Sequence, residues 1–166
     1  MSDQAVNVLF LCTHNSARSI LAEALLNHLG HGAFRAFSAG SSPRDNQRPN
    51  PMALKALEHA GIDTEGLRSK SWDEFAVPGT PPMDLIITVC DNAAGETCPH
   101  WPGHPATAHW GYADPSDTPG SDTQRLEAFT QTLIAMRRRL ELLVSLPRER
   151  LQHLQLQQSA RDLSGR

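Results

Sequence analysis

The sequence has few cysteines, no long hydrophobic run and no excess of basic residues. Its three cysteines in 166 residues are too few for a disulfide framework. No apolar run approaches the roughly 20 residues needed to span a bilayer, and residues 1–7 lack the features of a signal peptide. The net charge of −3 argues against a nucleic-acid partner. We therefore expect a cytoplasmic protein that binds neither membranes nor nucleic acids.

Apolar strands and amphipathic helices alternate along the chain. The hydrophobic pattern predicts strands at residues 6–11, 33–39, 83–89 and 107–110. It predicts helices at residues 19–29 and 52–60, one helical turn at residues 72–75, and a long helix that begins at residue 121 or 122. This alternation is typical of an α/β fold, and we expect a single domain with a four-stranded parallel sheet flanked by helices.

The domain is expected to cover residues 1–146, because Pro147 breaks the long helix. Residues 147–166 then form a C-terminal extension. A short helix is predicted at residues 148–158, and the last eight residues are expected to be disordered.

The first predicted strand ends at Cys12, and Arg18 and Ser19 follow where the next helix begins. Backbone N–H groups converge at such a helix start and bind a tetrahedral oxyanion. The planar guanidinium of Arg18 would bind two of its oxygens, and Arg18 and the helix dipole would favour Cys12 as a thiolate nucleophile. The predicted oxyanion-binding residues are Thr13, His14, Asn15, Ser16, Ala17, Arg18 and Ser19. Cys12 alone could be a buried structural cysteine, but the whole arrangement favours the nucleophile.

Three more candidate residues follow predicted strands. Cys90 ends the third strand, Cys98 lies in the long loop after it, and Asp114 precedes Pro115. Because carboxyl ends of parallel strands meet at one edge of a sheet, Cys12 and Cys90 can share a site. Cys90 and Cys98 could form a redox pair, bind a metal or be unreactive; their spacing does not fit a zinc site, so we predict no metal and no cofactor. Asp114 could be a general acid or a turn residue.

Residues 12–19 resemble the signature of the low-molecular-weight phosphatase fold, which protein-tyrosine phosphatases and arsenate reductases share. The segments I-I-T-V-C-D, E-T-C-P and H-W-G-Y-A-D-P resemble the arsenate reductases of this fold, as do S-A-G at residues 38–40 and the blocks within residues 61–75. The resemblance runs from about residue 6 to residue 143. Tyrosine phosphatases usually lack the cysteine pair and have aromatic residues after Asp-Pro, where this chain has Ser116 and Asp117.

The resemblance implies an arsenate reductase that serves arsenic detoxification. Cys12 would attack arsenate bound in the loop while Asp114 protonates the departing oxygen. Cys90 would then attack Cys12 and release arsenite, and Cys98 would attack Cys90 to leave a Cys90–Cys98 disulfide. Thioredoxin is the expected reductant, with glutathione and glutaredoxin as the alternative. Phosphate and sulfate would compete with arsenate.

Two positions depart from the pattern of that family. Ala17 stands where many relatives have a second loop cysteine, so no disulfide can form within this loop. Some relatives bind a potassium ion through residues resembling Asn15, Glu23 and Ser38 and a carboxylate, and Lys70 stands at the position of that carboxylate. Its ammonium group could replace the cation, which predicts independence of potassium. The alternative is that Lys70 is a surface lysine.

Two other functions stay open at this point. A low-molecular-weight protein-tyrosine phosphatase would need only Cys12, Arg18 and Asp114. A non-catalytic module that senses oxyanions or redox state would need no turnover. The reductase, in contrast, requires all three cysteines.

Overall fold

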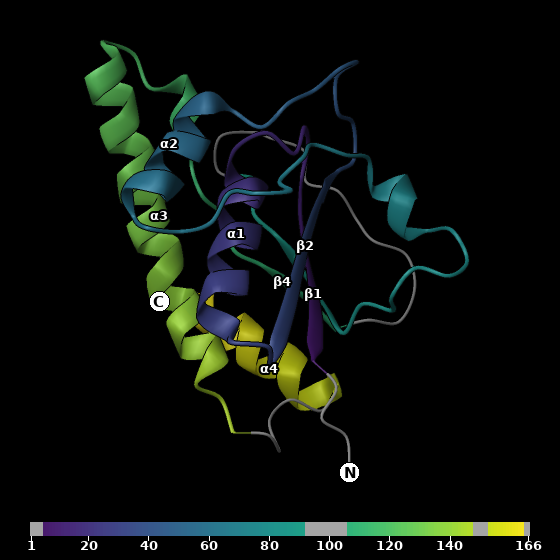
Figure 1. The fold of residues 1–166 in the computed structure, drawn as a ribbon. Coiled ribbons are helices and arrows are strands. Elements are labelled where there is room, and N and C mark those ends of the chain that lie inside the picture. Colours follow the sequence, from purple (N-terminus) through teal and green to yellow (C-terminus); the bar gives the residue numbers. More distant parts are fainter. Residues whose placement is uncertain (1–4, 92–105, 148–152, 165–166) are drawn as a thin grey trace.

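The computed structural model describes residues 5–91, 106–147 and 153–164. Its strands form one parallel sheet in the order β2-β1-β3-β4, which confirms the predicted α/β fold. The strands are β1 (Val6–Cys12), β2 (Phe34–Gly40), β3 (Leu85–Thr88) and β4 (Ala106–His109). β3 is shorter than the predicted strand at residues 83–89. Figure 1 shows the sheet with α1 and α3 on one side of it.

The first three helices begin within one residue of the predicted starts, whereas residues 148–152, where the last helix is predicted to begin, lie outside the described residues. The helices are α1 (Arg18–Gly30), α2 (Pro51–His59), α3 (Asp122–Val144) and α4 (His153–Leu163), with short 3₁₀ turns at Trp72–Phe75 and Pro115–Asp117. Asn50 caps α2 by accepting a hydrogen bond from the Met52 N–H group. Ser121 and Gln124 form a capping box at the start of α3. Local polar side chains therefore define where these two helices start.

The two faces of β1 are buried in two separate cores. Val8 and Phe10 belong to the larger core, which α1, α2 and α3 cover. Leu9 and Leu11 point to the other face, where Trp72 and Phe75 of the 3₁₀ turn pack against the same smaller core. The alternation of side chains along a strand explains this division, and it makes β1 the central strand of the fold.

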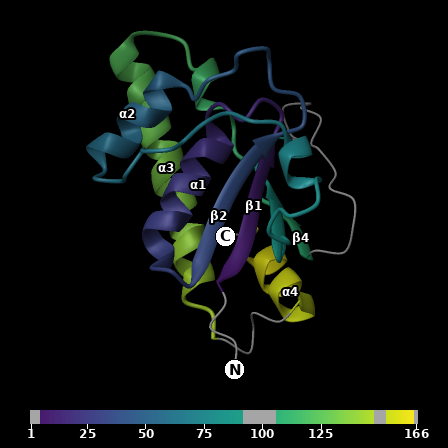
Figure 2. The same ribbon diagram turned by 45° about the vertical axis from the view of Figure 1, so that its right-hand side comes forward.

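The carboxyl ends of the strands bring distant segments together at one edge of the sheet, which lies at the top of Figure 2. The Val89 N–H group donates to the Leu11 carbonyl (2.9 Å), so the chain after β3 continues beside the end of β1. The Tyr112 N–H group donates to the Val89 carbonyl (3.3 Å). The segment after β4 therefore runs past the same edge, as parallel topology requires.

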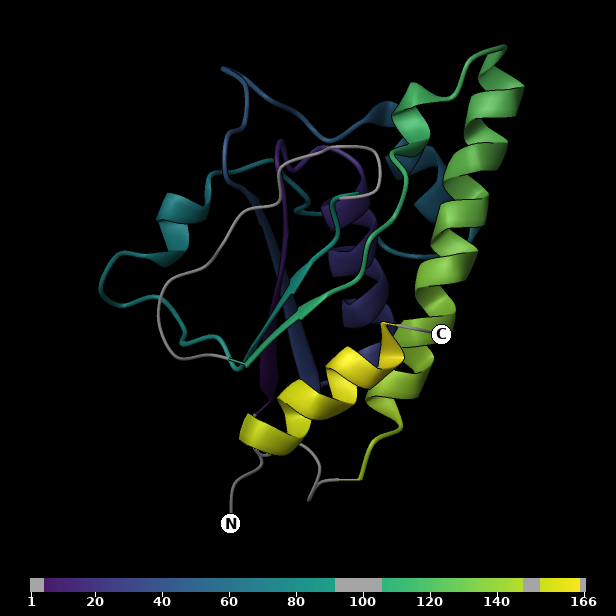
Figure 3. The ribbon, with the colours of Figure 1, turned by 180° about the vertical axis from the view of Figure 1, so that it is seen from behind.

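The C-terminal helix differs from the prediction. α4 extends to Leu163, so the expected end at residue 158 and the expected disorder of residues 159–163 are wrong. Ala160 and Leu163 are buried, and the indole N–H of Trp110 donates to the Ala160 carbonyl (2.9 Å). Figure 3 shows α4 in front of the lower part of the sheet, with its C-terminal end beside the lower part of α3. Docking against residues far away in the sequence orders this segment, and local composition carries no signal of it.

None of the helices in the described ranges combines the length and the apolar character that a membrane span requires.

Candidate oxyanion and thiol site

Residues 13–17 form the loop between β1 and α1, and the backbone of neighbouring segments holds it in place. The loop carbonyls of residues 12, 13 and 16 accept hydrogen bonds from the N–H groups of residues 41, 42 and 50, at 3.1, 2.9 and 2.7 Å. Gly40 allows β2 to approach the loop, since a Cβ atom there would lie 2.6 Å from the Thr13 carbonyl oxygen. The glycine of the S-A-G block is thus explained by close backbone packing.

The N-terminus of α1 faces this loop without a side-chain cap. Ala17 occupies the N-cap position and makes no side-chain cap hydrogen bond. Arg18 and Ser19 follow in the first turn, and both are buried. An uncapped helix start has N–H donors and a positive dipole end for an anion. These N–H groups lie at the loop where the sequence predicts that an oxyanion binds.

Two hydrogen-bond donors surround the sulfur of Cys12, which is a buried free thiol. The Asn15 N–H group donates to Sγ at 3.2 Å, and the Ser19 hydroxyl lies 2.9 Å from the same atom. Asn15 adopts a left-handed backbone conformation, with φ of 57°, which asparagine tolerates better than most residues. This turn is what directs its N–H group at the sulfur.

The side-chain amide of Asn15 donates to the Ser19 hydroxyl oxygen, so the hydroxyl proton can point to another acceptor. Its Oδ1 atom accepts the Lys70 N–H group (2.9 Å), so its Nδ2 group must be the donor to the hydroxyls around it. Nδ2 donates to Ser19 Oγ at 2.7 Å. Because Ser19 Oγ already accepts this hydrogen bond, its own proton is free to point at the Cys12 sulfur. When the sulfur is a thiolate it can only accept hydrogen bonds, so both neighbours then donate to it.

The same amide group leads to a buried ion pair. Asn15 Nδ2 donates to Ser38 Oγ (2.9 Å), and the Ser38 hydroxyl donates to Glu23 Oε1. Lys70 Nζ lies 3.8 Å from that carboxylate oxygen. Burial raises the pKa of Glu23, and the charge of Lys70 partly opposes this rise. Burial likewise lowers the pKa of Lys70, against the attraction of Glu23.

Lys70 is therefore not a surface lysine: only 8% of its side chain is exposed, so that interpretation is wrong. Its ammonium group already provides the positive charge beside Glu23, and it also donates to the Arg68 carbonyl (2.8 Å). The residues here do not fit an additional potassium ion. Within the described ranges there is also no group of three or more His, Cys, Asp or Glu residues that could hold a metal.

Arg18 connects the loop to the segment after β4. Its Nη1 atom donates to the Tyr112 carbonyl at 2.9 Å, and its Nη2 atom lies 3.6 Å from Asp114 Oδ2. The Arg18 side chain is only 7% exposed, whereas that of Asp114 is 27% exposed. The carboxylate thus lies beside the guanidinium group and remains accessible to a substrate and to solvent.

Asp114 caps a turn and also lies beside Arg18 in the site. Its Oδ1 atom accepts hydrogen bonds from the Ser116 N–H group (3.0 Å) and from the Ser116 hydroxyl (2.7 Å). Asp114 thereby caps the 3₁₀ turn that begins at Pro115. The two donors bind Oδ1, whereas Oδ2 is the oxygen that faces Arg18.

Cys90 is completely buried at the end of the strand that pairs with β1, and it is disulfide-bonded, whereas Cys12 is a free thiol. The two cysteines follow neighbouring strands at the same edge of the sheet. Cys98 lies outside the described residues. The structure therefore brings Cys12, Arg18 and Asp114 together and places Cys90 at the same sheet edge.

Two groups that shape the site are not among the residues predicted from the sequence. The Tyr112 carbonyl fixes Arg18, and the Ser116 donors orient Asp114. A backbone carbonyl has no signature in the sequence, since every residue has one; Ser116, in contrast, follows Asp-Pro where a serine can satisfy the turn.

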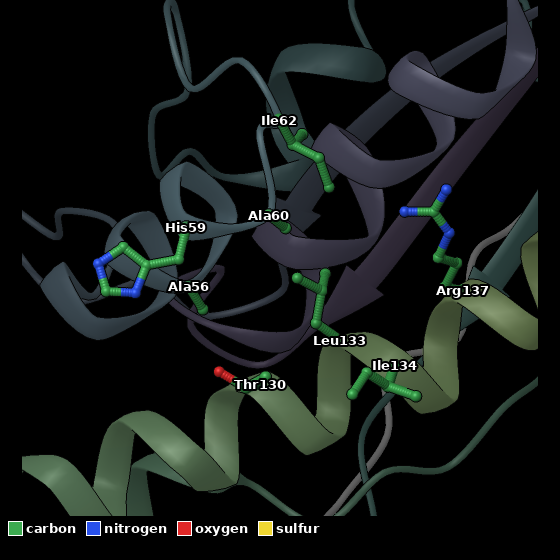
Figure 4. A pocket seen from close by; sticks show the side chains of 8 residues that line it. All are labelled: Ala56, His59, Ala60, Ile62, Thr130, Leu133, Ile134 and Arg137. Carbon is green, nitrogen blue, oxygen red and sulfur yellow. The ribbon is translucent and has the colours of Figure 1, made fainter.

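A separate shallow pocket between α2 and α3, shown in Figure 4, is lined by side chains such as Ala56, Leu133 and Ile134 and by none of the site residues.

Known proteins resemble this chain in sequence and in fold. Residues 7–157 match the family described as low molecular weight phosphotyrosine protein phosphatase. An arsenate reductase of Bacillus licheniformis is 37% identical over 123 residues, which are 74% of this chain and 83% of that protein. An arsenate reductase of Shouchella clausii is 33% identical over 122 residues, with the same coverage. The crystal structure of an arsenate reductase from Archaeoglobus fulgidus superposes with a TM-score of 0.66 at 27% identity, covering 84% of this chain and 99% of that one.

Replacing Asn15 by glycine tests the hydrogen-bond direction at Cys12. Glycine keeps the left-handed backbone but removes the amide that holds the Ser19 hydroxyl. We expect alkylation of Cys12 by iodoacetamide at pH 7 to slow about tenfold, since a hydrogen bond to a charged group contributes about 1.5–3 kcal/mol. Asn46→Gly is the matched control, because Asn46 is exposed and has a φ of 58°. Equal alkylation rates in the two variants would contradict the inferred network.

The ammonium group of Lys70 predicts that oxyanion binding needs no potassium. Protection of Cys12 by phosphate against iodoacetamide should be the same in KCl and in NaCl at fixed ionic strength. In Lys70→Ala, Glu23 loses the cation that lies 3.8 Å away, so binding should weaken. A specific increase of phosphate affinity with potassium in the unmodified protein would show that the prediction is wrong.

Proposed function

Because the chain belongs to the low-molecular-weight phosphotyrosine protein phosphatase family, and matches its arsenate reductases over most of its length, we propose that it reduces arsenate to arsenite. The observation that carries the proposal is that a free thiol with two hydrogen-bond donors and a second cysteine follow adjacent strands of the sheet. A phosphatase needs only the first of these cysteines. The second gives the site its source of electrons.

The first step is attack on arsenic. Arsenate binds to the N–H groups at the start of α1 and to Arg18, which neutralise its charge. The Cys12 thiolate forms a bond to arsenic(V), and an arsenate oxygen leaves as water once Asp114 Oδ2 has supplied a proton. The hydrogen bonds from Asn15 and Ser19 hold the sulfur in place for this attack. No electrons are transferred in this step.

Reduction occurs in the second step. The Cys90 thiolate attacks the Cys12 sulfur, a Cys12–Cys90 disulfide forms, and the sulfur–arsenic bond breaks with its electron pair left on arsenic. Arsenite(III) then departs. Cys98 attacks the Cys90 sulfur, Cys12 leaves as the thiolate, and a Cys90–Cys98 disulfide remains. Each cycle thus oxidises two thiols and reduces one arsenic by two electrons.

The reductant in this proposal is thioredoxin, because the product of the relay is a protein disulfide, which is the substrate of a dithiol reductant. Glutaredoxin with glutathione is the alternative donor. Either would act in the cytoplasm, where we expect the protein to work, since protein thiols are kept reduced there. Phosphate and sulfate should compete with arsenate for the loop, because they have the same tetrahedral shape and negative charge.

A second candidate function is phosphatase activity without the relay. The observation in its favour is that Asp114 lies 3.6 Å from Arg18 at the loop that holds Cys12, which provides a nucleophile, an anion-binding group and a general acid. Weak hydrolysis of aryl phosphates is therefore expected even in a reductase, and it does not by itself distinguish the two functions.

Arsenate-dependent oxidation of NADPH, coupled through thioredoxin and its reductase, tests the proposal. The wild type should turn over continuously. Cys90→Ser and Cys98→Ser should each stop after one cycle at most, because the disulfide that thioredoxin reduces cannot form. The matched comparison is hydrolysis of an aryl phosphate, which should survive in both variants. If arsenate drives no oxidation with either thioredoxin or glutaredoxin while all three proteins hydrolyse the aryl phosphate equally, the protein is a phosphatase.

A further inference from the structure

The C-terminal helix is attached to the edge strand of the sheet by polar contacts. The Thr107 N–H group of β4 donates to Gln157 Oε1 (3.2 Å). Arg161 Nε donates to the Thr107 carbonyl (3.1 Å). These side chains of α4 satisfy backbone groups that an edge strand otherwise exposes. α4 therefore substitutes for a neighbouring strand at this point of β4.

Arg139 of α3 joins the end of α4 to the segment that follows β4. Its Nη2 atom donates to the Ser164 carbonyl at 3.2 Å. The guanidinium carbon lies 4.9 Å from the ring centroid of Tyr112 and 5.9 Å from that of Trp110. Trp110 is itself bound to α4 through the Ala160 carbonyl. Arg139 thus contacts both aromatic rings of residues 110–112, and stacking of this kind stabilises a half-buried segment.

Tyr112, whose ring lies against the Arg139 guanidinium group, also holds Arg18 through its backbone carbonyl. The Tyr112 carbonyl accepts the hydrogen bond from Arg18 Nη1, and Asp114 follows two residues later. The ring of Tyr112 lies against Arg139 while its backbone lies against Arg18. Any movement of Tyr112 is therefore transmitted to the anion-binding group and to the acid together.

We propose that Arg139 is a positioning residue, which, with α4, holds residues 110–114, Asp114 included, against Arg18 in the arrangement that the reaction needs. Arg139 acts through Tyr112, because its guanidinium group contacts the Tyr112 ring and the Tyr112 carbonyl accepts from Arg18. The consequence for catalysis rests on the proposed function, whereas the effect on the Arg18 side chain does not. A displacement of about 1 Å at a reacting group can cost up to about a hundredfold in rate.

The experiment compares Arg139→Ala with Arg138→Ala. Arg138 is exposed on the same helix and carries the same charge, so it is a matched control. The first readout is the ¹⁵N–¹H spectrum of the arginine side chains of the full-length protein. In the wild type the Nη groups of Arg18 are held by Tyr112 and Asp114, so rotation about the Cζ–Nη bonds is slow and separate signals are expected. The second readout is arsenite release in a single turnover by the reduced protein.

In Arg139→Ala we expect the separate Arg18 signals to merge or broaden and the single-turnover rate constant to fall by about tenfold or more. Protection of Cys12 by phosphate should weaken by a smaller factor than the rate constant falls, because the N–H groups at the start of α1 still bind the anion. Arg138→Ala should match the wild type in all three measurements. A loss in rate without a comparable loss of anion binding is what distinguishes positioning from general destabilisation.

Unchanged Arg18 signals in Arg139→Ala would overturn the inference, whatever the activity, and so would altered signals with an unchanged rate. A wild type that releases no arsenite while its Arg18 signals still respond to Arg139→Ala would refute the proposed function and leave the positioning of Arg18 standing. If Arg139→Ala does not fold, Arg139→Gln keeps most of the side-chain volume and removes the charge. The Arg18 signals, the single-turnover rate and phosphate protection are then measured in that variant and interpreted in the same way.

Discussion

The chemistry of this site depends on the conformation of one asparagine. With its backbone in the left-handed region, Asn15 directs its N–H group at the Cys12 sulfur. Its side-chain amide accepts from the Lys70 backbone and donates to the Ser19 hydroxyl, which leaves the hydroxyl proton free to point at the sulfur. The amide is fully buried and connects residues that lie 55 positions apart in the sequence. A nucleophilic thiolate in a buried site needs such donors because water cannot reach it.

The parallel sheet explains why the rest of the site assembles where it does. Cys12 ends β1 and Cys90 follows β3, and these two strands are neighbours. The segment after β4 passes the same edge through the hydrogen bond between the Tyr112 N–H group and the Val89 carbonyl. The nucleophile, the second cysteine and the acid therefore follow three separate strands. The fold brings them to one edge of the sheet although they lie far apart in the sequence.

Short-range patterns carried most of the prediction. The strand, loop and helix around Cys12 could be predicted because hydrophobic periodicity and the positions of Arg18 and Ser19 are local features. The position of Lys70 could be interpreted only through a family resemblance, and its burial beside Glu23 agrees with that interpretation. What the sequence does not reveal depends on distant backbone groups: the carbonyl of Tyr112 lies 94 residues from Arg18, and the Ala160 carbonyl lies 50 residues from Trp110. The same reason explains why the predicted end of α4 is wrong: the last residues of this helix are ordered by docking and not by local propensity.

The most direct test of the account is the stoichiometry of one turnover without an external reductant. Fully reduced protein is mixed with excess arsenate, and the arsenite formed, the remaining free thiols and the disulfide connectivity are then measured. The account predicts about one arsenite for each chain, the loss of two of the three thiols, and a disulfide between Cys90 and Cys98 with Cys12 free. Release of no arsenite, with all three thiols still free, would contradict it.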